Sequence, residues 1–147
     1  MSIYGVNRPQ IIFQTLVTCD DAAALELAKT TATKFAADVM NIRKSEDIHE
    51  LTNWLSEDVV FNMCDSRLFK SHFVALVTQS LIDETKYPKD LTLEVENAFT
   101  REDILSMIVK ANGFVFETDD KLILEFKKQE DGTYKLSYGT ITTCTYQ

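Results

Sequence analysis

The chain has 147 residues, of which 45% are hydrophobic and 26% charged, a balance that suits one globular domain with a buried core. Fifteen basic residues against 23 acidic ones give a net charge of −8. This charge argues against a nucleic-acid binder and against docking on anionic lipid, because both depend on positive charge. No stretch approaches the ~20 apolar residues of a membrane-spanning helix. We therefore expect an acidic soluble protein, cytoplasmic by default, with neither nucleic-acid nor membrane partners.

The first part of the chain predicts an extended N-terminal segment followed by a long helix. We expect residues 1–20 to be the extended lead-in and residues 21–147 to form a single domain. Asp20 or Asp21 can cap the helix, since a carboxylate there accepts hydrogen bonds from free backbone N–H groups. Apolar residues then recur every three or four positions, which is typical of one buried helical stripe. They are Leu25, Ala28, Ala32, Phe35, Val39 and Ile42.

The middle of the chain predicts a second helix, a strand pair and a third helix. The second helix is expected over residues 45–58, with an apolar stripe on one side. A strand over residues 59–64 and a short return strand over residues 67–70 follow. Ser71 is placed to cap the third helix, which must end before Pro88 because the residue preceding a proline disfavours the helical conformation.

From Leu91 the apolar period changes to two, which predicts strands. Leu93, Val95 and Phe99 continue that alternation. β-branched residues favour a further strand over residues 104–116. The last predicted hairpin turns at Asp131-Gly132. Its inward-pointing residues are expected to be Leu122, Leu124 and Phe126 on one strand and Tyr134, Leu136 and Tyr138 on the other. Helices gathered ahead of antiparallel strands predict an α+β fold with the helices on one face of the sheet.

The residue types give little sign of cofactor chemistry. The three cysteines, Cys19, Cys64 and Cys144, do not have metal-ligand spacing. The two histidines do not cluster with other ligands, and the four glycines are isolated rather than grouped in a phosphate-binding loop. We therefore expect no metal and no cofactor.

The element order and three local stretches resemble the nuclear transport factor 2-like superfamily, which includes SnoaL-like proteins. The stretches are residues 54–61, residues 71–73 and the hairpin at residues 126–136, and the resemblance covers about residues 22–143. It implies three N-terminal helices packed in the concave face of a strongly curved, mainly antiparallel sheet. The element order is then αα-ββ-α-ββββ, and the sheet and helices form a cone.

In that fold the open end of the cone is a pocket, so the resemblance implies a set of pocket residues. The alternative for each of them is that it simply fills the core. The candidates are Phe35, Trp54, Phe61, Met63, Phe73, Leu93, Met107, Val109, Leu124 and Tyr138.

The resemblance does not bring a catalytic set with it. The ketosteroid isomerases of this superfamily need an aspartate base on the first strand and a tyrosine in the oxyanion site. The corresponding positions here are Asn62 and Met63 for the base and Phe35 for the tyrosine, which leans against an enzyme. A weaker alternative is an acid–base site centred on His72, helped by Asp65, Asn62 and Tyr138.

The resemblance also places the last strand beside the first, which would bring Cys64 near Cys144. Their Cα atoms could then fall within the ~4.4–6.8 Å that a disulfide needs. A disulfide would imply an oxidising compartment and a secreted protein; the alternative is two reduced thiols. Members of the superfamily often form homodimers through the outer sheet face. Ile123, Ile141 and Val115 are the candidates for that contact.

Three functions remain open on the sequence. The leading one is a non-catalytic domain that binds a small hydrophobic ligand in the cone or a protein partner through the sheet. The second is a cofactor-independent isomerase, dehydratase or cyclase acting on a hydrophobic substrate. The third is a protein-docking module.

Overall fold

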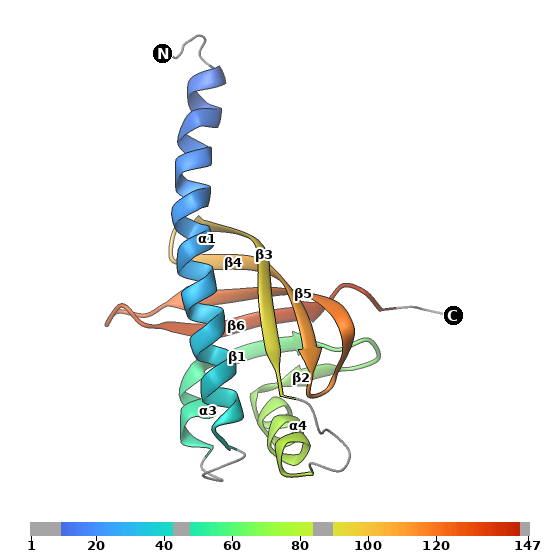
Figure 1. The fold of residues 1–147 in the computed structure, drawn as a ribbon. Helices are drawn as coiled ribbons and strands as arrows, with labels where there is room; N and C mark the ends of the chain where they lie inside the picture. Colours follow the sequence, from blue (N-terminus) through green and yellow to red (C-terminus); the bar gives the residue numbers. More distant parts are fainter. Residues whose placement is uncertain (1–9, 43–47, 84–89, 145–147) are drawn as a thin grey trace.

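Three helices precede or interrupt a sheet of six strands in the part of the chain that the structure describes (Figure 1). The computed structural model describes residues 10–42, 48–83 and 90–144, and within them the side chains of all but residues 10–21, 81–82 and 117–118. The helices are α1 (Gln10–Met40), α3 (His49–Trp54) and α4 (Lys70–Ile82). The strands are β1 (Leu55–Asn62), β2 (Arg67–Phe69), β3 (Thr92–Arg101), β4 (Ile104–Gly113), β5 (Phe116–Lys128) and β6 (Tyr134–Ile141).

Helix α1 begins well before the predicted start, and the expectation of an extended segment up to residue 20 is wrong for residues 10–20. The chain has no proline or glycine between Gln10 and Met40, so nothing in its backbone preferences stops the helix from running through Asp20 and Asp21. Those two aspartates therefore lie inside the helix rather than at its cap. The N-terminal part of α1 extends past the edge of the sheet (Figure 1).

The strands follow the order β2-β1-β6-β5-β4-β3. Strands β1 and β6 are parallel neighbours, and every other neighbouring pair is antiparallel. The last strand thus lies beside the first, as the resemblance implied. The stretch at residues 104–116 is confirmed as strand over Ile104–Gly113, after which a turn leads into β5.

The core lies between the inner face of the sheet and the helices. Helix α1 crosses β3 and β4, while α4 packs against β1 and β2. The rings of Phe35, Trp54 and Phe126 meet edge to face, with centroids 5.2–5.9 Å apart. Aromatic rings favour this geometry because the positive ring edge meets the negative ring face. The predicted α1 stripe from Ala28 to Ile42 is buried in this core.

Two boundaries differ from the sequence prediction. Strand β1 begins at Leu55, which the sequence places in the preceding helix, because α3 ends at Trp54 after only six residues. Helix α4 begins at Lys70, and its N-cap is Phe69 without a side-chain hydrogen bond, so Ser71 is not the cap. The predicted opening of the second helix at residues 45–47 lies outside the described residues.

A β-bulge in β3 reverses the expected direction of Phe99. The pairing of β3 with β4 shifts between Val95 and Asn97, which leaves Glu96 as an extra residue. A one-residue shift exchanges the two faces of a strand. As a result Ala98 is buried at 2% exposure, whereas Phe99 is 50% exposed on the outer face.

A second bulge, in β6, does the same to Tyr138. The pairing of β5 with β6 shifts between Glu125 and Phe126, so that Leu136 lies opposite Phe126 and Tyr138 lies opposite Glu125. Leu136 is fully buried on the inner face. Tyr138 points away from the cone, and its predicted inward direction is wrong.

Candidate functional site

The interior of the cone is nearly filled by side chains. Its cavity has a volume of about 30 Å³, enough for one or two water molecules. Sites for small ligands usually enclose about 300–1,000 Å³. All of the described residues around the cavity are apolar. They are Phe35, Val39, Phe61, Met63, Phe73, Leu76, Val77, Leu91, Leu93, Phe114, Val115, Phe116, Leu122 and Leu124.

Six of the ten predicted pocket residues line this cavity, namely Phe35, Phe61, Met63, Phe73, Leu93 and Leu124. Met107 and Val109 are buried in the same core without reaching the cavity wall. Trp54 lies in a separate groove beside α1 and α3. Tyr138 lies on the outer face of the sheet. The predicted set is therefore mainly packed core.

The weak catalytic candidates do not come together. His72 is exposed at the start of α4, with its ring centroid 6.4 Å from that of Phe69. Asp65 is exposed in the turn between β1 and β2. On the outer face, Asn62 Nδ2 donates a hydrogen bond to the Tyr138 hydroxyl at 3.3 Å. None of the four candidates lines the described cavity wall.

The described residues also lack a group of three or more His, Cys, Asp or Glu side chains that could hold a metal ion. Of the positions that resemble the isomerase set, Met63 and Phe35 reach the cavity. Asn62 faces outward, because its partner on β6 is Thr140, which in turn lies opposite the outward-facing Ile123 of β5. The cavity wall thus offers no proton acceptor among the described side chains.

The outer face of the sheet carries two rows of facing residues that run across all six strands. From β3 to β2 the first row is Phe99, Ser106, Glu125, Tyr138, Val60 and Phe69, and the second is Asn97, Ile108, Ile123, Thr140, Asn62 and Arg67. We call Val60, Phe99, Ile108, Ile123 and Tyr138 the outer apolar patch. Its two most exposed members are Phe99 at 50% and Ile108 at 39%.

Only one of the three residues predicted for a dimer contact belongs to this patch. Ile123 lies on the outer face between Ile108 and Thr140. Val115 instead lines the cavity, because it lies in the turn between β4 and β5. Ile141 pairs with the buried Leu122 and packs against the core. The sequence did not predict Phe99 or Ile108 on the outer face. For Phe99 the reason is the bulge at Glu96, which alternation along the sequence does not reveal.

An ionic cluster borders the patch at one end of the strands. Lys121 Nζ lies 3.0 Å from the Glu96 carboxylate, and Lys110 Nζ lies 3.9 Å from Glu94 and 4.0 Å from Glu96. These side chains are 30–73% exposed, so each pair contributes little to stability. The cluster gives the patch a polar rim.

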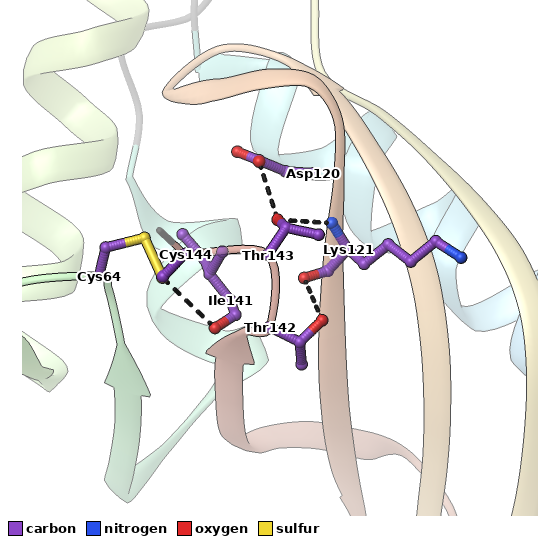
Figure 2. The surroundings of a disulfide bond; sticks show 7 residues. All are labelled: Cys64, Asp120, Lys121, Ile141, Thr142, Thr143 and Cys144. Carbon is purple, nitrogen blue, oxygen red and sulfur yellow. Dashed lines mark hydrogen bonds between the residues drawn. A yellow bond between two sulfur atoms is a disulfide. The ribbon is translucent and has the colours of Figure 1, made fainter. Parts of the chain in front are cut away.

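A disulfide joins the ends of β1 and β6. Cys64 and Cys144 have Cα atoms 5.3 Å apart and are bonded through their sulfurs (Figure 2). The Cys144 sulfur lies 3.6 Å from the carbonyl oxygen of Ile141. Since a disulfide sulfur carries no hydrogen, this approach is a packing contact rather than a hydrogen bond.

The chain before Cys144 is also hydrogen-bonded to β5, at Asp120 and Lys121 (Figure 2). The Thr142 N–H and hydroxyl both donate to the carbonyl oxygen of Lys121, at 2.8 and 3.1 Å. The Thr143 hydroxyl donates to Asp120 at 3.0 Å and accepts from the Lys121 N–H at 3.2 Å. These bonds hold residues 142–144 where Cys144 can reach Cys64.

None of the described helices combines the length and apolar character needed to cross a membrane.

No protein-family model and no curated protein matches the sequence. Solved structures do match. A designed nuclear transport factor 2-like (NTF2-like) protein is 13% identical over 78% of this chain and 98% of its own, with a TM-score of 0.59. A conserved protein from Planctomyces limnophilus is 13% identical over 78% and 94%, with a TM-score of 0.55. An NTF2-like protein from Cytophaga hutchinsonii is 15% identical over 78% and 96%, with a TM-score of 0.51. The chain therefore has the NTF2-like cone fold, and identities this low establish the fold alone.

Proposed function

We propose that this protein is a non-catalytic NTF2-like domain that pairs with a second copy of itself through the outer apolar patch. The observation that carries the proposal is the contrast between the two faces of the sheet. The inner face is covered, and its cavity of about 30 Å³ is smaller than a ligand. The outer face exposes Phe99 and Ile108 next to half-buried Ile123 and Tyr138. Exposed apolar surface with a polar rim is typical of a protein–protein contact.

The size of the outer face supports a second copy as the partner. Six strands about 4.8 Å apart, with about eight residues each at ~3.3 Å, cover about 750 Å². A stable interface buries roughly 800 Å² on each partner. In a two-fold symmetric dimer, each copy would contribute this same face, and the two sheets would pack about 10 Å apart as in other sheet pairs.

Glu125 places a condition on this pairing. It lies in the first row between Ser106 and Tyr138, and it is already half-buried in the single chain. A buried carboxylate is costly unless a donor reaches it. The facing copy can supply donors from Arg67 or from the Tyr138 hydroxyl. A pairing that left Glu125 without a donor would be strongly disfavoured.

Light scattering coupled to gel filtration tests the proposal, with Ile108→Lys as the variant. We expect the wild-type protein to be a dimer and Ile108→Lys a monomer with an unchanged circular dichroism spectrum. The control is Ile48→Lys, because Ile48 is equally exposed, at 38% against 39%, but lies before α3 and outside the patch. A monomeric wild-type protein at about 100 μM, or the same loss of dimer in both variants, would overturn the proposal.

A second candidate is a small apolar ligand in the cone, and the wholly apolar lining favours it. Such a ligand would have to displace side chains such as Phe73 or Met63, since the existing volume is too small. Native mass spectrometry of the purified protein tests it. A retained mass of a few hundred daltons would support the ligand, and the bare polypeptide mass would count against it.

A further inference from the structure

A polar groove lies outside the cone, between α1, α3 and the turn that joins β5 to β6. We call it the flank groove; the residues on which the argument depends are Thr31, Lys34, Asp38, Asn53, Trp54 and Tyr134. Its volume is about 330 Å³, within the usual range for a small-ligand site. None of its residues belongs to the outer apolar patch, so an occupant here does not depend on the proposed pairing.

Two of the three charges that line the flank groove, Lys34 and Asp38, are paired with each other. One carboxylate oxygen of Asp38 accepts from Lys34 Nζ at 3.0 Å and from Trp54 Nε1 at 2.9 Å. The other acid at the rim, Glu50, is exposed to solvent. Because Lys34, the one cation in the described lining, is already paired with Asp38, the groove offers no unpaired cation to an anion, and we expect it to suit a neutral molecule with hydroxyl groups.

Thr31 gives the groove a hydroxyl that can bind a polar ligand. Its side chain lines the groove and is only 7% exposed, and its hydroxyl makes no hydrogen bond to the described residues but still reaches solvent, unlike the enclosed hydroxyls of Thr78 and Ser80. The neighbouring Thr30 differs, since its hydroxyl donates to the carbonyl oxygen of Glu26 at 3.1 Å. A ligand hydroxyl in the groove would replace water as the hydrogen-bond partner of Thr31.

Two aromatic rings complete the lining. Trp54 is half-buried and fixed by edge-to-face contacts with Phe35 and Phe126, while Tyr134 is half-buried at the start of β6. Fixed rings with a polar tip offer an apolar surface at little entropic cost. Sugar rings combine apolar C–H faces with hydroxyl edges. We propose that the flank groove binds a small neutral polyhydroxylated molecule, of the size of a mono- or disaccharide.

The single tryptophan of the chain makes this proposal directly testable, because Trp54 lies in the groove. Glucose, galactose, N-acetylglucosamine and cellobiose would each be titrated while the Trp54 indole N–H resonance is followed by NMR. We expect at least one sugar to give a saturable shift with a Kd near the millimolar range, about −4 kcal/mol. Tetramethylammonium chloride and sodium phosphate serve as the ionic probes.

The matched variants are Thr31→Val and Thr33→Val. Both replace a threonine of α1 by its isostere, but Thr33 is exposed and does not line the groove. Thr31→Val should weaken sugar binding about three- to tenfold, and Thr33→Val should leave it unchanged. The proposal is overturned if no sugar gives a saturable shift, if both variants bind equally well, or if only an ionic probe binds.

Discussion

Gly139 occupies the point on β6 where the Phe61 ring lies against the inner face of the sheet. A Cβ atom there would meet two ring carbons of Phe61 at 2.4 and 2.5 Å and Leu124 at 3.2 Å. Such distances require the ring to move, and overpacking of this kind costs about 1–3 kcal/mol. Gly139→Ala should therefore lower the free energy of unfolding by about that amount in urea denaturation.

A double-mutant cycle separates this clash from a general effect of the substitution. Phe61→Leu shortens the side chain that the new methyl group would meet. Combined with Gly139→Ala, it should destabilise the protein by less than the sum of the two single changes, since contacting residues are not additive. Strict additivity would show that the Phe61 ring is not what excludes a side chain at Gly139.

A second residue-scale prediction concerns the turn between β5 and β6. The Thr133 hydroxyl donates a hydrogen bond to the Asp131 carboxylate at 2.6 Å, and the Thr133 N–H donates a second at 3.0 Å. These bonds, chiefly the one from the hydroxyl, lower the pKa of Asp131 below its ordinary 3.8. Because the folded pKa is depressed, this stabilisation is present above about pH 3.8 and is lost as the pH falls through the folded value. Thr133→Val should raise the pKa of Asp131 toward 3.8 in an NMR titration of its carboxyl carbon.

Thr142→Val is the control for that titration, because the Thr142 hydroxyl donates to a backbone carbonyl rather than to a carboxylate. It should leave the pKa of Asp131 unchanged. An unchanged pKa in Thr133→Val as well would mean that the hydrogen bond from the Thr133 hydroxyl does not exist in solution.

Two of the side chains whose direction the sequence misjudged are Phe99 and Tyr138, and both errors have the same cause. Strict alternation predicts that Phe99 shares a face with Val95 and that Tyr138 shares a face with Leu136. One extra residue in each strand reverses this direction. The local sequence does not mark these bulges, since neither Glu96 nor Ser137 is a glycine. The candidate surface therefore could not be predicted from alternation alone.

At the scale of elements, the disulfide stabilises the junction of the first and last strands. Cys64 and Cys144 are 80 residues apart in sequence. In the chain-entropy account, a loop of that length contributes about 4.5 kcal/mol by restricting the unfolded state. The double variant Cys64→Ser/Cys144→Ser should lose about that much unfolding free energy in urea, with hydrogen exchange rising first at the ends of β1 and β6.

Mass spectrometry after alkylation of the denatured, unreduced protein is the companion measurement. One label, on Cys19, is the expected result. Three labels would show that the two thiols are reduced, and the double variant should then match the wild type in stability. If the bond is present in the natural protein, an oxidising compartment follows as its place of maturation.

The elements themselves were largely predictable, because their apolar periods are long and regular. The α1 stripe and the hairpin around Asp131-Gly132 both lie where the period predicted them. Helix boundaries were not predictable to the same degree. Aspartates 20 and 21 are compatible with a cap and with a helix interior, and the sequence does not decide between the two.

At the scale of the whole molecule, the order of helices and strands sufficed to predict the cone, but its filling could not be predicted. Whether a curved sheet encloses a ligand or a packed core depends on volumes summed over side chains from several elements. Phe61, Phe73 and Phe116 come from three different elements and meet at the cavity, with the Phe61 ring centroid 5.2 Å from Phe73 and 6.5 Å from Phe116. The spacing of these phenylalanines along the sequence does not predict that their rings contact one another.

A filled cone should become a binding cavity when one of these rings is removed. Phe73→Ala should cost about 3–5 kcal/mol and leave an apolar void, because Phe73 is 7% exposed and lines the existing space. Dry apolar voids of that kind take up benzene. Saturating benzene should therefore raise the melting temperature of Phe73→Ala but not that of the wild type.

Phe73→Leu provides a milder variant if the alanine form does not fold. A rise in the melting temperature of the wild type with benzene would show that the natural cone already opens. The proposed dimer should persist in these variants, since the cavity and the outer apolar patch lie on opposite faces of the sheet.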